Sequence, residues 1–165
     1  MGALKSAFAG LARVTVLIAA VSLCALVMVL AWQVFGRYVL NNSPSWTEPV
    51  AMTLMSVAAL FGAAIAVRAE THFAFPTLVE SAPKPARAAL KLLGRIIALV
   101  FGAALAWFGG FLMWDSWDVP MAGAPMPEGV SSVGLCGGGA LIALFALERI
   151  LFGDPPDPHA PAQES

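Results

Sequence analysis

The sequence predicts an all-α integral membrane protein with four transmembrane helices and both termini in the cytoplasm. Three observations favour this fold class: four long apolar segments, a charged fraction of only 12%, and basic residues gathered on one side of those segments. Soluble domains carry about 25% charged residues, so half that fraction is typical of a membrane protein. A helix crosses the hydrocarbon core of a bilayer with about 20 mainly apolar residues.

The four apolar segments predict helices over about residues 14–35, 46–67, 88–114 and 130–152. Together they form one membrane domain over residues 1–152. The apolar core of the first segment exceeds the roughly 7–15 residues of a signal peptide, so we expect an uncleaved helix. The Pro-rich, polar tail over residues 153–165 is expected to be disordered. It favours a chain that is separate from any larger partner.

The basic residues predict the orientation. Eight of the nine Lys and Arg residues lie on one side of the four segments, and Arg37 lies alone on the other. Because excess Lys and Arg stay in the cytoplasm, both termini are expected inside and the connections 38–45 and 115–129 outside. Four tryptophans lie near the predicted outer interface: Trp32, Trp46, Trp114 and Trp117. They favour either an aromatic belt at the headgroups or a docking surface for an outer partner.

The first outer connection carries two charged residues, Arg37 and Glu48. The run from Ser45 through Trp46 to Glu48 matches a capping box, in which the Ser hydroxyl accepts a free backbone N–H and the Glu reaches back to another. Glu48 also faces the positive end of the helix dipole. A second, compatible hypothesis is that Glu48 pairs with Arg37 and fixes the first two helices against each other.

Basic residues on the inner side indicate contact with lipid. Arg87, Lys91 and Arg95 recur every four positions and form a stripe on one helical face. Such a stripe extends its charges to anionic headgroups, either as a general anchor or as a specific lipid site. Arg68 ends the second segment, and His72 follows it as an expected surface residue.

Small residues recur every four positions in three of the segments. They are Ala58, Gly62 and Ala66; Gly102, Ala106 and Gly110; and Gly134 and Gly138. Faces of this kind let membrane helices approach closely, so their expected role is packing. The pattern leaves open whether these faces meet each other or a helix of another chain.

The sequence argues against several classes of function. No Asp, Glu, Lys or His lies in the middle of a segment, so no ion-coupling site is visible, and no set of nucleophile and base indicates an enzyme. Cys24 and Cys136 lack the spacing of a metal or redox pair and are interpreted as apolar fillers without a disulfide. No paired histidines could hold haem, so no cofactor is predicted. A net charge of -1 without a basic aromatic patch argues against nucleic acid.

Two stretches, "WQVFGRYVLNNSPSWTEPVAMTLM" and "FGAAIAVRAETHFAF", resemble the small membrane subunit of tripartite ATP-independent periplasmic (TRAP) transporters, the DctQ-like family. The residues that carry the resemblance are Arg37, Tyr38, Asn41, Asn42, Ser45 to Glu48, Gly62, Ala63, Arg68 and His72. The resemblance covers about residues 32–133. Two features depart from it: Pro49 stands where many members have a second acidic residue, and "GLCGGGAL" is unusual for the fourth helix.

The resemblance implies a complex in the bacterial inner membrane. A large permease subunit would move the substrate by symport with sodium, and a periplasmic substrate-binding protein would deliver it, typically as an organic anion with a carboxylate. The small subunit would be a non-catalytic scaffold that braces the large subunit, with a contribution to docking the binding protein left open. Arg37 and Glu48 would then lock the first helix pair beside the partner.

Three other functions stay open on the residues alone. They are a stand-alone four-helix transporter such as a drug pump, a membrane oxidoreductase acting on thiols or quinones, and an assembly factor for another complex. A pump needs a membrane-embedded carboxylate, and Glu48 lies too near the surface for that role. An oxidoreductase needs reactive cysteines or haem ligands.

Overall fold

The computed structural model describes residues 2–42, 44–69 and 84–153. Within these ranges the chain forms four long helices: α1 (Gly2–Tyr38), α2 (Thr47–Arg68), α4 (Lys84–Asp115) and α5 (Val133–Phe152). A short 3-10 helix, η1 (Glu128–Ser132), leads into α5. All four long helices have the length and composition of membrane spans. The predicted all-α fold with four spanning helices is confirmed.

The helix ends differ from the predicted ranges mainly at the N-termini. α1 begins at Gly2 rather than near residue 14, because "GALKSAFAGLAR" contains good helix formers and no proline to stop the helix. α4 begins at Lys84 instead of residue 88. Hydropathy locates the part of a helix that lies in lipid, whereas helix ends depend on local backbone bonding. The predicted tail from residue 154 onward and His72 lie outside the described residues.

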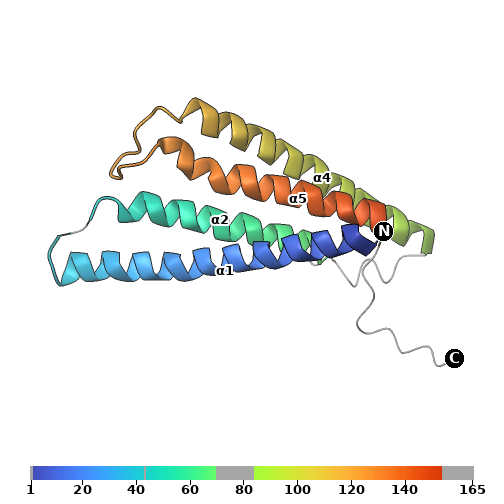
Figure 1. The fold of residues 1–165 in the computed structure, drawn as a ribbon, viewed down its shortest axis with the longest axis horizontal. Helices are drawn as coiled ribbons and strands as arrows, with labels where there is room; N and C mark the ends of the chain where they lie inside the picture. Colours follow the sequence, from blue (N-terminus) through green and yellow to red (C-terminus); the bar gives the residue numbers. More distant parts are fainter. Residues whose placement is uncertain (1, 43, 70–83, 154–165) are drawn as a thin grey trace, which may run out of the picture.

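The four helices lie side by side in the order α1, α2, α5, α4 (Figure 1). α1 packs on α2, α2 packs on α5, and α5 packs on α4, so α1 and α4 form the two edges. The central position of α5 shows in its burial: 39% of its apolar stretch is buried, against 11% for α1. An arrangement of this kind leaves broad apolar faces that the four described helices do not cover.

The core lies toward the end of the molecule that carries the N-terminus, where the helices draw together (Figure 1). Phe145 of α5 is completely buried there and belongs to a core cluster in which alanine is the most frequent residue. The buried core residues are Ala12, Ala64, Val67, Ala98, Ile142, Phe145 and Ala146. Alanine-rich surfaces of this kind bring helix backbones close together and strengthen their van der Waals contacts.

The glycine-rich start of α5 is explained by its two neighbours. Gly138 faces Leu60 of α2, whereas Gly139 faces α4, where an added Cβ would lie 2.5 Å from the backbone nitrogen of Ala106. Two close helices therefore require small residues on two sides of α5. The Gly134/Gly138 face of α5 therefore meets α2, and the Gly102/Ala106 face of α4 meets α5 at Gly139. An added Cβ at Gly62 of α2 would have no neighbour within 4 Å among the described residues.

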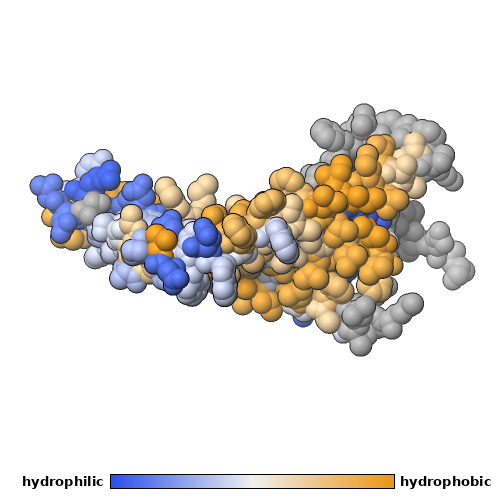
Figure 2. All heavy atoms as spheres, turned by 90° about the horizontal axis from the view of Figure 1, so that it is seen from above, coloured by the Kyte–Doolittle hydropathy of each residue, from blue (hydrophilic) through white to orange (hydrophobic). Residues whose placement is uncertain are grey.

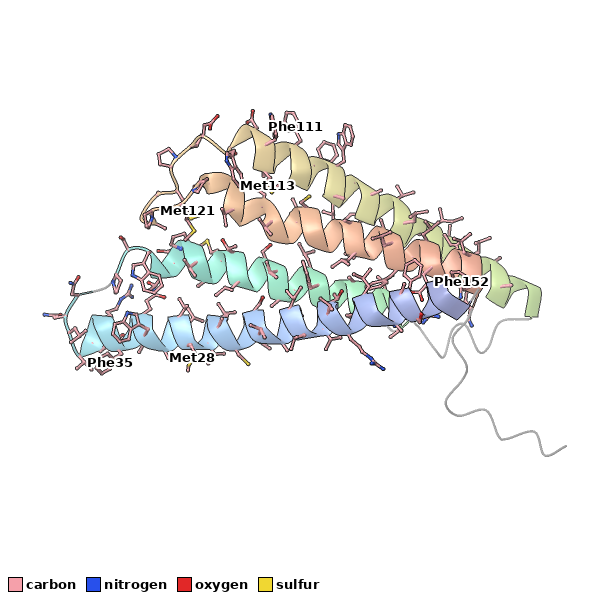
Figure 3. All side chains as sticks on the ribbon, viewed as in Figure 1. Met28, Phe35, Phe111, Met113, Met121 and Phe152 are labelled. Carbon is pink, nitrogen blue, oxygen red and sulfur yellow. The ribbon has the colours of Figure 1, made fainter. Side chains whose placement is uncertain are left out.

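Apolar side chains cover much of the outer surface. Met28 on α1 and Phe111 on α4 point away from the other helices (Figure 3) and are among the most exposed large hydrophobic residues. Figure 2 shows hydrophobic residues along the helices, with hydrophilic residues gathered toward the end that carries the two connections. In water this surface would be unstable, so its surroundings are lipid or other membrane helices.

Candidate functional site

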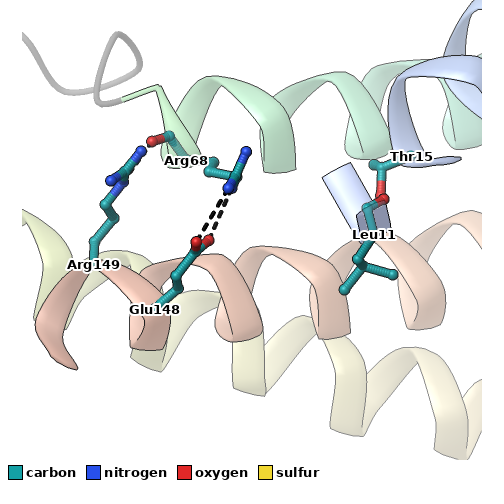
Figure 4. Close-up of polar contacts among 5 residues, drawn as sticks. All are labelled: Leu11, Thr15, Arg68, Glu148 and Arg149. Carbon is teal, nitrogen blue, oxygen red and sulfur yellow. Dashed lines mark hydrogen bonds and ion pairs between the residues drawn. The ribbon is translucent and has the colours of Figure 1, made fainter. Parts of the chain in front are cut away.

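A buried ion pair joins the C-terminal ends of α2 and α5. Arg68 donates from Nε to Oε2 of Glu148 at 2.8 Å, and from Nη2 to Oε1 at 3.1 Å (Figure 4). Only 7% of the Glu148 side chain is exposed, and 25% of the Arg68 side chain. A two-point contact between a guanidinium and a carboxylate is stronger and more directional than a single hydrogen bond. This pair therefore fixes the distance and the rotation of α2 against α5.

Two further contacts support the pair. The guanidinium carbon of Arg68 lies 5.6 Å from the centre of the Phe145 ring, close enough for cation–π attraction. Nε of Arg149 donates to the backbone oxygen of Arg68 at 2.7 Å. That bond satisfies a carbonyl at the end of α2 and places positive charge at the negative end of the helix dipole. We call Arg68, Glu148 and Arg149 the Arg68 clamp.

The two connections meet at the opposite end of the molecule. Ser45 donates from Oγ to the backbone oxygen of Gly123 at 3.0 Å. Gly123 has a φ of 87°, and an added Cβ would lie 2.8 Å from the oxygen of Ser45, so this position requires glycine. The α4–α5 connection is also folded on itself, with the Glu128 nitrogen donating to the Val119 oxygen at 2.8 Å. We call Ser45 and Gly123 the loop joint.

The predicted capping box is wrong. The N-cap of α2 is Trp46, which makes no side-chain cap hydrogen bond. Ser45 therefore lies one position too early to cap the helix, and its hydroxyl serves the loop joint instead. Thr47, which is fully buried, donates from its hydroxyl to the Pro44 oxygen at 2.8 Å.

The predicted pairing of Arg37 with Glu48 is also not formed. Both side chains are exposed, and among the described residues these two make no ion pair with each other. The returning chain packs against the Gly36 face of α1, where an added Cβ would lie 2.9 Å from the Asn42 oxygen. Arg37, the next residue along the helix, lies about 100° further around it and is exposed.

The residues predicted to contact lipid are distributed along α4 and its end. Trp114 is 85% exposed, and Trp117 is exposed as well. Lys91 and Arg95 lie on α4 and are half-buried. Arg87 belongs to the first turns of α4, and its side chain, like His72, lies outside the described residues. The roles of these residues at lipid stay predictions.

Most of the chain matches a known protein family. The family model for tripartite ATP-independent periplasmic transporters, DctQ component, matches residues 26–153. This chain belongs to the DctQ family. The matched range contains the loop joint and all three residues of the Arg68 clamp. Family and helices together make the DctQ chain a multi-pass protein of the bacterial inner membrane.

A curated relative supports the same family. The sialic acid TRAP transporter small permease protein SiaQ of Vibrio cholerae serotype O1 is 33% identical to this DctQ chain over 87 residues. The match covers 53% of this chain and 50% of the relative. The chain thus spans about half the length of the curated relative that it matches.

Sequence reasoning missed the Arg68 clamp in this DctQ chain. Arg68 and Glu148 are 80 residues apart, and each reads alone as a charged residue at the end of a span. One signal was present: Glu148 is an acidic residue on the side where the basic residues gather. This signal predicts an ion pair only once α2 and α5 are known to be neighbours.

Proposed function

We propose that this DctQ chain is the small permease subunit of a sodium-driven TRAP transporter and that it acts as a scaffold for the large permease subunit. The substrate would be an organic anion that a periplasmic binding protein delivers. The observation that most strongly supports this proposal is the family match over residues 26–153. In this role the chain moves no substrate itself and supplies a rigid surface to the subunit that does.

The helix arrangement supports a scaffold. α1 and α4 lie at the edges, so each packs mainly against one neighbour and has much of its surface available to a partner. The exposed side of α4 carries large aromatic residues, among them Trp107 and Phe111. Aromatic and small side chains on rigid helices make good membrane contacts without large losses of side-chain entropy.

Rigidity is supported at both ends of the helices. The Arg68 clamp ties α2 to α5 at one end, and the loop joint ties the α1–α2 connection to the α4–α5 connection at the other. Between them, the glycine contacts hold α5 close to both of its neighbours. A subunit that keeps its own shape can hold a moving partner subunit at a fixed position in the membrane.

The proposed orientation places the Arg68 clamp in the cytoplasm and the loop joint in the periplasm, following the bias of Lys and Arg toward the cytoplasm. The periplasmic end then carries both connections and the tryptophans near them. A periplasmic binding protein docked on the complex would approach this end.

Uptake in the host bacterium tests the proposal. A strain without this chain is expected to lose uptake of at least one labelled organic acid from a panel that includes sialic acid, and a plasmid copy should restore it. Replacing sodium by potassium in the medium should abolish the same uptake in the wild type. Undiminished uptake of every acid in the panel without the chain would contradict the subunit role. Loss of uptake with the chain but no dependence on sodium would contradict only the proposed driving ion.

A further inference from the structure

An open groove runs along the contact between α1 and α2. Its apolar part has a volume of about 520 Å³ and is lined from both helices, with Leu23 and Leu26 on α1 and Met55, Ala59 and Gly62 on α2. An added Cβ at Gly62 would meet nothing within 4 Å. The small residues on this wall therefore leave space that the described part of the chain does not fill.

A second cavity continues the groove toward the Arg68 clamp. It has a volume of about 550 Å³ and shares Val16 and Ile65 with the first, so the two are contiguous. Three arginines line it: Arg13, Arg68 and Arg149. One long groove therefore has an apolar body and a basic end.

The three arginines at the basic end of the groove differ in their hydrogen-bond and ion-pair partners. Arg68 is bound to Glu148 through two nitrogens, and Nε of Arg149 is bound to a backbone oxygen. Arg13 is exposed and makes no hydrogen bond or ion pair with the described residues. Because Arg13 lacks such a partner, the lining favours an anionic group beside it.

We propose that this groove binds an anionic phospholipid, with its phosphate at Arg13 and an acyl chain between α1 and α2. A soluble anion would gain nothing from the apolar body of the groove. An apolar helix from a partner would cover the body but leave the basic end without a counter-charge, which is unfavourable near the membrane. An anionic lipid matches both parts, and its headgroup meets the side of the membrane on which basic residues gather.

Native mass spectrometry of the full chain, purified in mild detergent with any polypeptides that accompany it, tests this proposal. The probes are phosphatidylglycerol and phosphatidylcholine with identical acyl chains, and glycerol 3-phosphate as the soluble headgroup. Phosphatidylglycerol is expected to bind more tightly than phosphatidylcholine. Arg13→Gln should weaken the binding of phosphatidylglycerol about tenfold, as expected for loss of one charged hydrogen bond. Gly62→Leu fills the groove and should weaken the binding of both lipids.

Matched controls separate the site from general effects. Arg37→Gln removes the arginine at the other end of α1, and Gly10→Leu makes the same substitution as Gly62→Leu at another glycine with open space around it. Both should leave lipid binding unchanged. If Gly62→Leu fails to fold, Ala59→Leu on the same wall takes its place.

Three results would overturn the proposal. The first is equal binding of the two lipids, or binding that Arg13→Gln does not change. The second is displacement of the lipid by glycerol 3-phosphate at equal concentration, which would indicate a site for a soluble phosphate. The third is loss of an accompanying polypeptide in Gly62→Leu with lipid binding intact, which would indicate a partner helix in the groove. None of these results depends on the proposed transport function.

Discussion

Replacing Glu148 by leucine is expected to lower the free energy of unfolding by about 3–5 kcal/mol, because Arg68 would be left partly buried without its counter-charge. The contact is a two-point ion pair in which the Glu148 side chain is only 7% exposed. Water therefore cannot easily replace Glu148 as the partner of the Arg68 guanidinium. Thermal or denaturant unfolding of the purified chain in detergent, followed by tryptophan fluorescence, measures the change.

Two comparisons make this result specific to the ion pair. Glu48→Leu removes an exposed carboxylate that has no ion pair with Arg37, and should change stability by less than about 0.5 kcal/mol. The double variant Arg68→Met/Glu148→Leu replaces the pair by apolar side chains and should recover most of the loss. A double variant as unstable as Glu148→Leu alone would show that the loss does not come from an unpaired Arg68. Equal effects at Glu48 and Glu148 would show that the Arg68 clamp contributes little.

The second large effect is expected from adding a single methyl group between α4 and α5. Gly139→Ala should lower the free energy of unfolding by about 1–3 kcal/mol through overpacking. The new Cβ would lie 2.5 Å from the Ala106 nitrogen and 2.9 Å from the Gly102 oxygen, and both are backbone atoms that cannot rotate away. The two helices would have to separate along their contact.

Gly62→Ala is the matched control for this substitution. It adds the same atom to α2 where nothing lies within 4 Å, so stability should stay equal or rise slightly through the higher helix propensity of alanine. The two variants are compared in the same unfolding measurement. If both glycines tolerate alanine equally, the close approach of α4 and α5 is not a main source of stability.

The fold was largely predictable because hydropathy and length respond directly to the bilayer. Four apolar segments of about 20 residues or more leave few alternatives to four helices. Helix ends were less predictable: nothing in the apolar pattern shows that α1 extends back to Gly2. The small-residue faces of α4 and α5 correctly indicated packing, whereas Gly62 of α2 lines an open groove. The sequence also could not assign Gly138 to α2 and Gly139 to α4. That assignment requires the order of the helices in space.

The polar contacts were predicted poorly for a related reason. Local reasoning paired Ser45 and Glu48 within one turn, whereas the Ser45 hydroxyl reaches Gly123, a residue 78 positions away. It paired Arg37 with Glu48 across a short connection, whereas the buried ion pair joins Arg68 to Glu148 across two helices. A capping box requires the serine at the N-cap, and a shift of one residue in the start of α2 removes it.

The central claim, that this DctQ chain is one subunit of a larger permease, is tested most directly by its partners. The tagged chain is purified from host membranes in mild detergent, and the proteins recovered with it are identified and quantified by mass spectrometry. We expect a larger membrane polypeptide with many spans, present at a constant ratio to the chain through successive purification steps. Recovery of the chain only with copies of itself would contradict the scaffold role and would point instead to a stand-alone four-helix transporter.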